Sequence, residues 1–558
     1  MTPQQNKNEI LDVAVVGGGV SGVYSAWRLL RDSSPTTFPN GGARPRITVF
    51  EGSERIGGRL LSVTPPGMPN TTCELGGMRF MSRHVIVSAL VEYFELPVGP
   101  FPVFEPNNIA FLRGSQLRLT DLNVPSEIPY RFSDVEKKVV EDPNNGLLLY
   151  ALKQLIPNCL DISYEDLTLE VQKASFAGTP LREHGFWNLL ARILTPDGYA
   201  FVRDSCGYDL IVSNCNAADA ILFILSDFGP GVVYSRCVNG YDQLPKKIAD
   251  EFEGAGGKIQ FNSWLASVDS KKLSDGTNGV ELHFRDGSIV HARHVILAMP
   301  RRSLELLEHT GSVFDWRNKD VWTMIESVYP IPMLKIFLAY RYPWWKAANV
   351  SQGRTLTDLP IRQCYYWDTV KEGNVESNAV LLASYDDENS VSYWTGLRKT
   401  SMDTEYYQPT KQFEGEPVTP NDWNGYLAPK AMVEEAHRQI VQMHGVGYAP
   451  EPYAATYRDW AEDPYGGGIN VWQIGANSWE VVNTIVHPRA DVPVYICGSA
   501  YSHEQGWVEG ALNTAELMLK KCFNLKSHLH NTQSDTSTVK APAGVMSSLK
   551  SPEKPAHR

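Results

Sequence analysis

Residues 11–30 read LDVAVVGGGVSGVYSAWRLL and form the first recognisable unit of the chain. The Val-rich run at 11–16 is typical of a strand buried on both faces of a parallel sheet, and the apolar residues after Gly22 recur with helical spacing. Between them, Gly17, Gly19 and Gly22 fit the pattern G-x-G-x-x-G. These glycines allow a tight turn, close approach of a pyrophosphate to the backbone, and close packing of helix on strand. The segment therefore predicts a dinucleotide-binding strand–turn–helix unit.

A second strand, at residues 47–50, ends at Glu51. An acidic residue at this place accepts a hydrogen bond from a ribose 2′-hydroxyl and disfavours a 2′-phosphate, so NADP is disfavoured. Glu51 lies further from Gly22 than the roughly 20 residues usual for the motif. Segment 32–46 is rich in Ser, Pro, Thr, Gly and Asn, and it explains the excess as a loop inserted before the second strand. FAD and NAD both remain open on this evidence.

The strands that are expected to be parallel and buried lie far apart in the sequence. Besides the two already described, apolar runs at 294–299 and 494–497 predict buried strands, and Gly510–Lys521 predicts a last helix. If these strands share one sheet, the nucleotide-binding domain is discontinuous. We therefore predict an α/β fold with a discontinuous Rossmann-like domain, a mixed-sheet substrate-binding domain and a helical insertion.

The remaining segments complete this division. Residues 85–230 are expected to be mainly helical, 258–269 and 280–284 to be strands, and 320–400 to form a mixed sheet. The tail loses nearly all large apolar residues and gains Ser, Thr, Pro and Lys, which predicts disorder. The expected domains are 10–84, 235–310 and 450–525 for the nucleotide-binding part, 85–234 for the mainly helical part, 311–449 for the substrate-binding part, and 527–558 for the disordered tail.

Composition narrows the functional classes. The 558 residues carry a net charge of −12 without a basic cluster, so we expect no nucleic-acid partner. The eight cysteines form no CxxC pair or zinc spacing, so we expect no metal site. No run of 18 apolar residues occurs, so no membrane span is expected. The polar N-terminus lacks the features of a secretory signal, so we expect an intracellular, cytoplasmic location.

Two further segments carry a family resemblance. Residues 51–59, EGSERIGGR, and residues 74–80, ELGGMRF, are similar to the FAD-binding region of the flavin-containing amine oxidases. Within that superfamily the chain resembles the L-amino-acid oxidases. Matching segments follow in order along roughly residues 10–523: GYDQLP at 240–245, VILAMP at 295–300, LKIF at 334–337, TDLP at 357–360, and Gly498 with Gly506-Trp507.

The resemblance implies FAD, bound in an extended pose across a discontinuous domain. Residues 465–469, YGGGI, stand where monoamine oxidases have a cysteine that tethers the flavin, so the FAD should be non-covalent. The family usually shows Gly-Glu where this chain has Gly498-Ser499, so the ribityl contact should be weaker or different. The implied cofactor-binding residues are Gly17, Gly19, Val20, Ser21, Gly22, Glu51, Gly52, Gly58, Arg59, Gly77, Met78, Arg79, Val268, Trp460, Gly498, Ser499, Trp507, Val508 and Ala511.

Arg79 is the residue on which substrate specificity is expected to depend. Amino-acid oxidases have arginine at this motif position, whereas monoamine and polyamine oxidases do not. A guanidinium group binds a carboxylate through two parallel hydrogen bonds, as the α-carboxylate of an amino acid requires. By the same resemblance Tyr385 supplies a hydroxyl to that carboxylate, and Tyr365 shapes the pocket wall. A structural ion pair of Arg79 with a core Asp or Glu is the alternative.

Lys335 is expected to be buried, because it stands between apolar residues in PMLKIF. In the family this lysine holds a water against flavin N5. The resemblance further implies that Trp507 forms the opposite wall and that the carbonyl of Gly506 accepts from the substrate amine. The last helix, beginning near Gly510, should point its positive end at the flavin. Some family members have a histidine base where this chain has Asp227, so we assign no histidine base.

These residues predict oxidative deamination of L-amino acids to 2-oxo acids, ammonia and hydrogen peroxide, with O₂ as the second substrate. Lys335 is the expected catalytic residue. Three alternatives stay open: an amino-acid 2-monooxygenase, an amine or polyamine oxidase, and a flavin-binding scaffold without activity. The side-chain preference of the substrate is not fixed by the sequence, and a homodimer is compatible with it.

Overall fold

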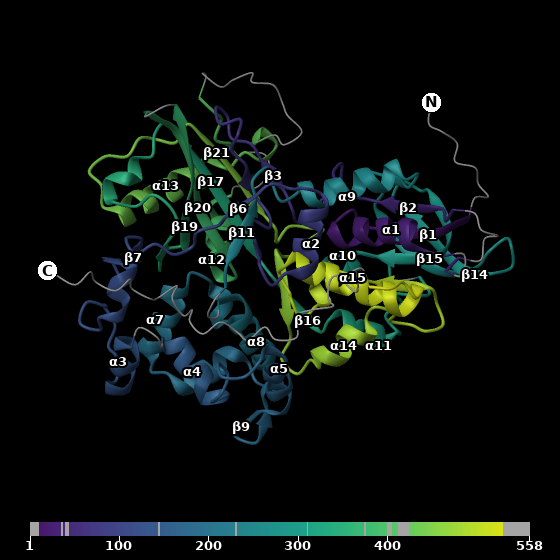
Figure 1. The fold of residues 1–558 in the computed structure, drawn as a ribbon, viewed down its shortest axis with the longest axis horizontal. Coiled ribbons are helices and arrows are strands. Elements are labelled where there is room, and N and C mark those ends of the chain that lie inside the picture. Colours follow the sequence, from purple (N-terminus) through teal and green to yellow (C-terminus); the bar gives the residue numbers. More distant parts are fainter. Residues whose placement is uncertain are drawn as a thin grey trace.

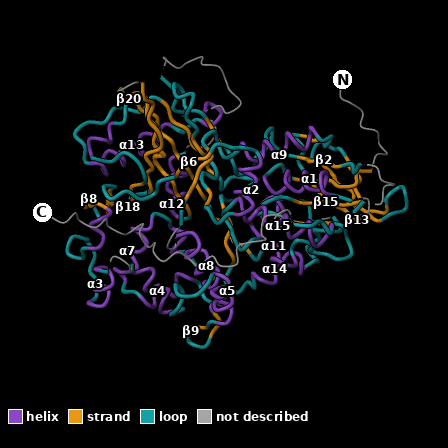
Figure 2. Tube along the Cα trace, viewed as in Figure 1, coloured by secondary structure: helices purple, strands orange, loops and turns teal. Residues whose placement is uncertain are grey.

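The computed structural model describes residues 10–34, 37–38, 44–142, 146–228, 232–309, 311–372, 375–398, 404–410 and 423–527. Three regions meet at the centre of the molecule (Figure 1). A sheet wrapped by helices lies on the right, a second sheet lies at the upper left, and a helical region lies below it, as the colouring by secondary structure in Figure 2 also shows. Residues 528–558 of the predicted tail lie outside the described residues. The exact domain boundaries stay a prediction.

The right-hand region is built on one parallel sheet from strands that are distant in sequence. Its order is β12-β2-β1-β15-β23, and β14 and β13 continue antiparallel from the first half of β15. The carboxyl ends coincide, because Val16 pairs with Phe50 and Leu297, and Leu297 pairs with Ile496. This confirms that the four predicted strands share one sheet. The bounds are β1 Ile10–Val16, β2 Ile47–Phe50, β12 Lys258–Gln260, β13 Leu265–Lys272, β14 Asn278–Phe284, β15 Ile289–Leu297 and β23 Val494–Ile496.

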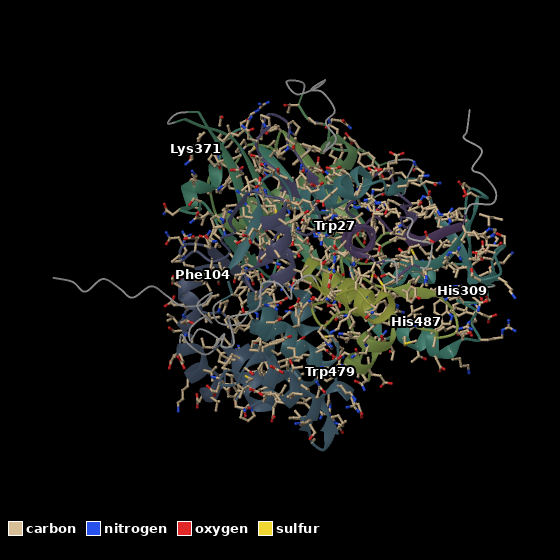
Figure 3. All side chains as sticks on the ribbon, turned by 45° about the vertical axis from the view of Figure 1, so that its right-hand side comes forward. Trp27, Phe104, His309, Lys371, Trp479 and His487 are labelled. Carbon is tan, nitrogen blue, oxygen red and sulfur yellow. The ribbon has the colours of Figure 1, made fainter. Side chains whose placement is uncertain are left out.

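Helices cover this sheet because its strands are apolar on both faces. α1 (Val20–Asp32) contacts both α9 (Gln243–Gly254) and α15 (Val508–Phe523). Trp27 of α1 is buried in this core and lies near the centre of the view in Figure 3, between Lys371 at the upper left and His487 at the lower right. Further helices outside the helical region are α2 Val85–Tyr93, α10 Arg301–Glu305, α11 Lys319–Ile325, α12 Asn389–Leu397 and α14 Ser478–Thr484.

The second region is the predicted mixed sheet, of order β21-β17-β20-β19-β18-β7-β8. Every pair is antiparallel except β18 with β7. α13 (Lys430–His444) packs against β17, β20 and β7. The bounds are β7 Ile109–Leu112, β8 Ser115–Arg118, β17 Met333–Tyr340, β18 Arg354–Thr357, β19 Gln363–Glu372, β20 Val375–Asp387 and β21 Ala454–Asp459.

The hairpin β7–β8 was not expected within residues 85–230, which are otherwise mainly helical as predicted. Arg113 and Gly114 both have positive φ, at 48° and 79°, as a two-residue hairpin turn requires. The signal was the apolar run Ile109–Leu112 followed directly by Arg-Gly, and the strands around it join a sheet whose other members come much later in the sequence. Small strand pairs complete the fold: β3 Ser62–Val63 with β4 Cys73–Glu74, β5 Phe80–Met81 and β6 Val98–Pro100 with β11 Tyr234–Cys237, β9 Ser175–Phe176 with β10 Thr179–Pro180, and β16 Val328–Ile331 with β22 Ile469–Trp472.

The helical region starts its helices with well-formed caps. Ser133, Ser163 and Thr195 each accept a hydrogen bond from a backbone N–H of the first turn. α7 ends at Gly207, whose left-handed conformation turns the chain back toward the mixed sheet. As a result, Tyr208 and the end of α8 lie at the centre of the molecule. The bounds are α3 Asp134–Glu141, α4 Leu147–Leu155, α5 Tyr164–Lys173, α6 Phe186–Ile193, α7 Pro196–Cys206 and α8 Ala217–Phe228.

Candidate active site

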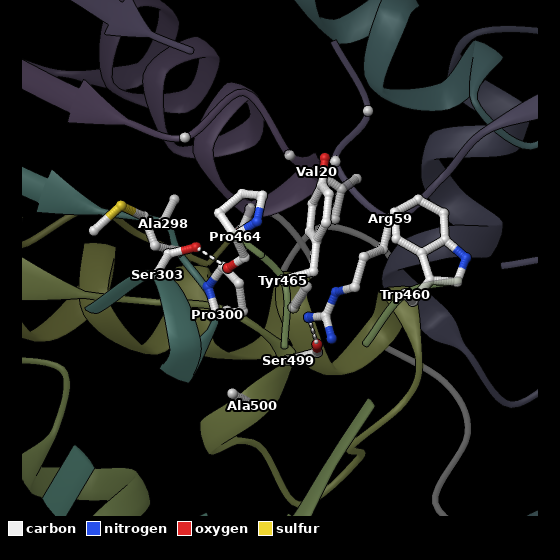
Figure 4. A pocket seen from close by; sticks show the side chains of 18 of the residues that line it. Val20, Arg59, Ala298, Pro300, Ser303, Trp460, Pro464, Tyr465, Ser499 and Ala500 are labelled. Atoms are coloured by element: carbon white, nitrogen blue, oxygen red, sulfur yellow. Dashed lines mark hydrogen bonds between the residues drawn. The ribbon is translucent and has the colours of Figure 1, made fainter. Parts of the chain in front are cut away.

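A cavity of about 460 Å³ lies at the carboxyl ends of the parallel strands and extends to the mixed sheet. Open α/β sheets bind ligands at this edge. Figure 4 shows side chains from several parts of the chain gathered around it. The lining includes these residues predicted from sequence: Gly17, Gly19, Val20, Ser21, Glu51, Gly52, Gly58, Arg59, Gly77, Lys335, Tyr385, Trp460, Gly498, Ser499, Gly506, Trp507, Val508 and Ala511. Five others stand outside the lining: Gly22, Met78, Arg79, Val268 and Tyr365.

The three glycines of the turn have different surroundings. Gly17 and Gly22 are packed closely against protein atoms, whereas Gly19 faces open space. A Cβ atom at Gly22 would lie 1.9 Å from the Gly17 carbonyl oxygen, and one at Gly17 would lie 2.4 Å from the carbonyl oxygen of Ala298. A Cβ atom at Gly19 would meet nothing within 4 Å, because Gly19 faces the cavity. α1 begins directly after Gly19 and has no acidic residue in its first turn. This end of the cavity therefore fits a pyrophosphate.

Glu51 stands at the nucleotide end of the cavity with its carboxylate held in place. One oxygen accepts from the Gly18 backbone N–H at 2.6 Å, and the other accepts from the backbone and hydroxyl of Ser53 at 2.8 and 2.7 Å. The exposed ring of Trp264 covers Gly52 so closely that a Cβ there would lie 2.8 Å from the indole. These contacts orient the carboxylate at the place where the motif positions a ribose.

Val268 of β13 stands outside the lining of the cavity. The lining near this strand consists of Leu265, its first residue, and of Ser263 and Trp264, which precede it. Val268 is 1% exposed, and its side chain packs in the core. A strand advances by about 3.3 Å per residue, so Val268 lies roughly 10 Å further along than Leu265. The contact of the Val268 backbone with adenine stays a prediction.

Arg59 projects into the cavity without an acidic partner among the described residues (Figure 4). Its guanidinium donates to the Gly468 carbonyl at 2.8 Å and to the Ser499 hydroxyl at 3.0 Å. Burial lowers the pKa of Arg59 to about 10, so the side chain remains charged at neutral pH. Ser499 is the residue that departs from the family's usual Gly-Glu, and here its hydroxyl supports Arg59. An unpaired cation beside an open glycine turn fits an anionic dinucleotide.

Lys335 is buried on β17 and reaches the cavity near its centre. Its ammonium donates to the carbonyl of Glu74 at 3.1 Å and to that of Gly76, and it lies 4.8 Å from the ring centroid of Tyr385. Burial lowers the pKa of Lys335 to about 7, although the nearby carboxylate of Glu74 favours the charged form. An ammonium has three N–H donors, so one remains for a ligand or water in the cavity.

Arg79 lies next to this cavity in a cage of aromatic side chains and is only 7% exposed. Its guanidinium donates to the hydroxyls of Tyr365 at 3.3 Å and Tyr208 at 3.4 Å. The guanidinium carbon lies 4.2 Å from the ring centroid of Tyr234 and 5.4 Å from that of Phe101. No ion pair of Arg79 with a carboxylate occurs within the described part of the chain.

The electrostatics of the cage keep Arg79 charged. Burial alone would lower its pKa, but the surrounding tyrosine hydroxyls outweigh burial and raise the pKa above its ordinary value. Burial would likewise raise the pKa of Tyr365, yet the charges of Arg79 and Arg354 lower it. The cage therefore holds a permanent positive charge with no anion in contact.

Three members of the cage were missed by sequence reasoning. Tyr208 follows α7 and packs edge-on against Tyr385 with ring centroids 5.5 Å apart. Tyr234 belongs to β11, which pairs with β5 next to Arg79. Phe101 follows β6, on the other side of β11. No local pattern marks them, although the aromatic residues around Gly207 and β11 would be the place to search.

The last helix, α15, begins at Val508, two residues before the predicted start. Val508 and Ala511 of its first two turns line the cavity. Glu509 points away, because its carboxylate accepts from the backbone N–H groups of Ile86 and Val87 at 2.9 and 2.8 Å. The positive end of α15 is therefore left to the cavity.

Neither a metal site nor a membrane-spanning helix is found in the part of the chain that the structure describes. No group of three or more His, Cys, Asp or Glu side chains is placed to hold a metal ion. No helix in the described ranges has the length and apolar character needed to cross a membrane.

Comparison with known proteins identifies the family. The model for flavin-containing amine oxidoreductases matches residues 20–517. Aplysianin-A of Aplysia kurodai is 27% identical over 548 residues, which cover 92% of this chain and 91% of that protein. Achacin of Lissachatina fulica is 27% identical over 544 residues, with 92% and 93% covered. The L-amino-acid oxidase of Mus musculus is 24% identical over 466 residues, with 81% and 65% covered.

Among solved structures, putrescine oxidase bound to putrescine superimposes with a TM-score of 0.59 at 16% identity. The match covers 91% of this chain and 98% of that one, and it shows a shared fold. The glycine turn, the unpaired Arg59 and the composite sheet agree with the flavin cofactor that the family name states. The chain belongs to the flavin-containing amine oxidoreductase family.

Proposed function

We propose that this protein is an FAD-dependent L-amino-acid oxidase. The observation that carries the proposal is Arg79, a buried guanidinium whose neighbours are tyrosine hydroxyls and aromatic rings instead of a carboxylate. A buried charge is costly unless it is paired. The α-carboxylate of an amino acid supplies the missing anion, and a simple amine cannot. The core ion pair considered as the alternative role of Arg79 is not seen among the described residues.

The strand register brings the carboxylate-binding end and the reactive end of the site together. Lys335 of β17 is directly opposite Tyr385 of β20, and Tyr365 lies on the next strand, β19. Cross-strand neighbours are about 5 Å apart. An amino acid whose carboxylate is bound by Arg79 and Tyr385 thus lies within a few ångströms of the cavity where Lys335 points. This short span suits a substrate that carries its carboxylate and its reacting C–H bond on the same carbon.

FAD bound in the cavity would supply the chemistry by taking the hydride from Cα of the neutral amine and passing two electrons to O₂, which leaves as H₂O₂. The chain's own residues orient the substrate for this transfer. Trp507 forms a wall, the Gly506 carbonyl accepts from the amine, and the remaining N–H of Lys335 holds a water. The imino acid then reacts with water to give a 2-oxo acid and ammonia. The overall balance is amino acid, O₂ and water to 2-oxo acid, ammonia and H₂O₂.

Non-covalent binding of FAD is supported by the lining of the cavity. None of the described lining residues is a cysteine, and the segment at 465–469 that was compared with the tethering motif contributes Tyr465, Gly468 and Ile469. The flavin should therefore be released by denaturation with acid and separate from the protein on a filter. Retention of flavin absorbance on the denatured chain would contradict this part of the proposal.

Relatives named as L-amino-acid oxidases support the substrate class at modest identity, including the mouse protein already described and one from Crotalus adamanteus, which is 23% identical over 359 residues. Putrescine oxidase shares the fold but is named for a diamine without a carboxylate. The distinction between these substrates depends on Arg79.

The test is a peroxide assay with wild type and Arg79→Met across the twenty L-amino acids, selected D-forms, and the corresponding amines. Loss of the buried guanidinium should lower kcat/KM for amino acids by at least about 100-fold, as for other buried charged pairs. Turnover of amines should change much less. An equal loss for amino acids and amines would contradict the assignment, and an amide product with CO₂ instead of a 2-oxo acid would identify a monooxygenase.

A further inference from the structure

Asp227, near the end of α8, is a buried carboxylate that touches the substrate wall. It is 2% exposed. One oxygen accepts from the indole N–H of Trp507 at 2.6 Å, and the other accepts from Arg83 at 3.1 Å and from the hydroxyl of Ser226 at 2.9 Å. Arg83 also donates to Glu504 at 2.6 Å. The helical region is therefore tied to the segment that leads into α15 through the side chain of Trp507.

Trp507 has two aromatic neighbours as well. Its ring lies parallel to Tyr234, with an interplanar angle of 12° and centroids 6.5 Å apart. The ring of His84 meets it edge-on at 4.9 Å. Neither ring contact includes a hydrogen bond to the indole, so neither selects between its two flipped orientations. The single N–H of tryptophan is its only hydrogen-bonding group, so the bond to Asp227 decides the orientation.

We propose that Asp227 is a positioning residue that fixes the indole of Trp507 as the wall of the substrate site. The inference rests on the proposed function, because Trp507 lines the cavity and its ring lies parallel to that of Tyr234, a member of the Arg79 cage. Asp227 itself stands outside the cavity lining, so it acts through Trp507 and not on the substrate. With the indole released, an amino acid bound to Arg79 loses the surface that holds its Cα.

The surroundings of Asp227 make this contact sensitive to pH. Burial raises the pKa of Asp227 to about 6, while the charge of Arg83 and the hydrogen bonds from Trp507 and Ser226 lower it, and Glu504 raises it. The other titratable groups that face this cluster among the described residues include Tyr164 of α5, Tyr234 of β11, Glu509 of α15 and His84. Burial raises the pKa of Glu509 to about 7, while its hydrogen bonds from the backbone of Ile86 and Val87 lower it. Burial lowers the pKa of His84 to about 3, so His84 is neutral over the range in which Asp227 titrates. As the pH falls through about 6, Asp227 gains a proton and its ion pair with Arg83 is lost.

Kinetics of three variants test the role. Asp227→Ala removes the acceptor, and we expect kcat/KM for the best amino acid to fall between about 10-fold and about 100-fold, chiefly through KM. Asp227→Asn keeps an acceptor for the indole N–H and should recover to within about 3-fold at pH 8. Asp219→Ala is the matched control, because Asp219 is a half-buried carboxylate on the same helix that does not line the cavity. It should change kcat/KM by less than about 2-fold. Equal effects of the two alanine variants would overturn the proposal.

A spectroscopic measurement separates this proposal from the proposed function. The holoenzyme is labelled with 5-fluorotryptophan, and the ¹⁹F resonance of Trp507 is assigned from Trp507→Phe. In wild type this resonance should titrate with a midpoint near pH 6, and in Asp227→Asn the titration should vanish. A Trp507 resonance that is the same in wild type and Asp227→Ala at every pH would overturn the positioning role. If the titration is seen but no amino acid is oxidised, the positioning role stands and the proposed substrate class fails.

Discussion

The cofactor cavity and the Arg79 cage lie side by side but recognise their ligands by different means. At the glycine turn the chain offers backbone N–H groups, a helix N-terminus and the space left by a missing Cβ at Gly19. In the cage it offers side chains: one guanidinium ringed by tyrosines and Phe101. The glycine turn depends on residues that are adjacent in sequence, whereas the cage collects Tyr208, Tyr234 and Tyr365 from three distant segments.

This difference determines which mutations each site can tolerate. A site formed by the backbone loses stability or ligand binding when a Cβ atom is added to it. The reason is that its close contacts involve main-chain atoms, which cannot move independently. A side-chain site loses one interaction at a time, since each hydroxyl contributes separately. Mutations in the two sites should therefore differ in kind as well as in size.

The largest effect is expected at Gly22, where an added Cβ would lie 1.9 Å from the Gly17 carbonyl. Gly22→Ala should destabilise the protein by roughly 3 kcal/mol or more through overpacking, with or without FAD. Gly19→Ala should leave the unfolding midpoint of the apoprotein unchanged, because its Cβ meets no protein atom and its φ of −71° suits alanine. It should weaken FAD binding by at least about tenfold, since the Cβ occupies the pyrophosphate space.

Thermal unfolding of apo and FAD-loaded protein, together with the ratio of flavin to protein absorbance, checks both variants. Equal destabilisation of the apoprotein by Gly19→Ala and Gly22→Ala would contradict the assignment of Gly19 to the ligand space. Normal FAD binding by Gly19→Ala would contradict it as well.

An intermediate effect is expected on the face of the mixed sheet that lies away from the cage. His444 of α13 donates from Nδ1 to the Ile440 carbonyl at 2.8 Å, and its Nε2 accepts from the hydroxyl of Tyr366 at 2.8 Å. Burial lowers the pKa of His444 to about 4. Between pH 6.5 and 4 the unfolded chain binds the proton and the folded chain does not, so stability falls as the pH is lowered. The contribution is roughly 2–3 kcal/mol.

Denaturant unfolding at pH 7.5 and pH 4.5 measures this contribution of His444 to the free energy of unfolding. His444→Gln keeps polar contacts but cannot titrate, so the loss of stability between the two pH values should be smaller by about 2 kcal/mol than in wild type. The flavin absorbance of the variant at pH 7.5 should stay normal, because His444 is remote from the cavity lining. An unchanged pH dependence would show that His444 is not a source of acid sensitivity.

The smallest effect is expected at Tyr208. Tyr208→Phe removes one hydroxyl at 3.4 Å from Arg79 but keeps the ring against Tyr385. We expect KM for amino acids to rise by about 5-fold with kcat nearly unchanged, as for the loss of a single hydrogen bond to a charged group. Tyr366→Phe is the matched control on the other face of β19, where the hydroxyl contacts Thr355 and His444.

Steady-state kinetics of Tyr208→Phe and Tyr366→Phe show whether a hydroxyl near Arg79 affects KM more than one on the other face of the sheet. Tyr366→Phe should lower stability by about 1 kcal/mol and leave KM unchanged. If Tyr208→Phe had no effect on KM, the hydroxyl of Tyr208 would not belong to the carboxylate site.

Much of the fold and the cofactor cavity was predictable because the relevant signals are local. The glycine turn, the strand ending at Glu51 and the later apolar runs predicted one discontinuous sheet, and the register confirms it. The hairpin at residues 109–118 was missed because its strands pair with residues near 355, which a local pattern does not reveal. Period and composition do not show where along a strand a cavity begins, and the lining includes Leu265 of β13 but not Val268.

The sequence by itself determined the strand–turn–helix unit and its three glycines. The conformation of each glycine depends on residues close to it in the sequence or on the next strand. It also singled out Arg79 and Lys335, whose motifs are short and continuous. Only the tertiary structure decided that Arg79 has tyrosines and no carboxylate around it, and that Asp227 holds Trp507 across 280 residues of chain. The physical reason is that side-chain contacts between distant segments depend on how sheets and helices pack, which no local pattern of residues encodes.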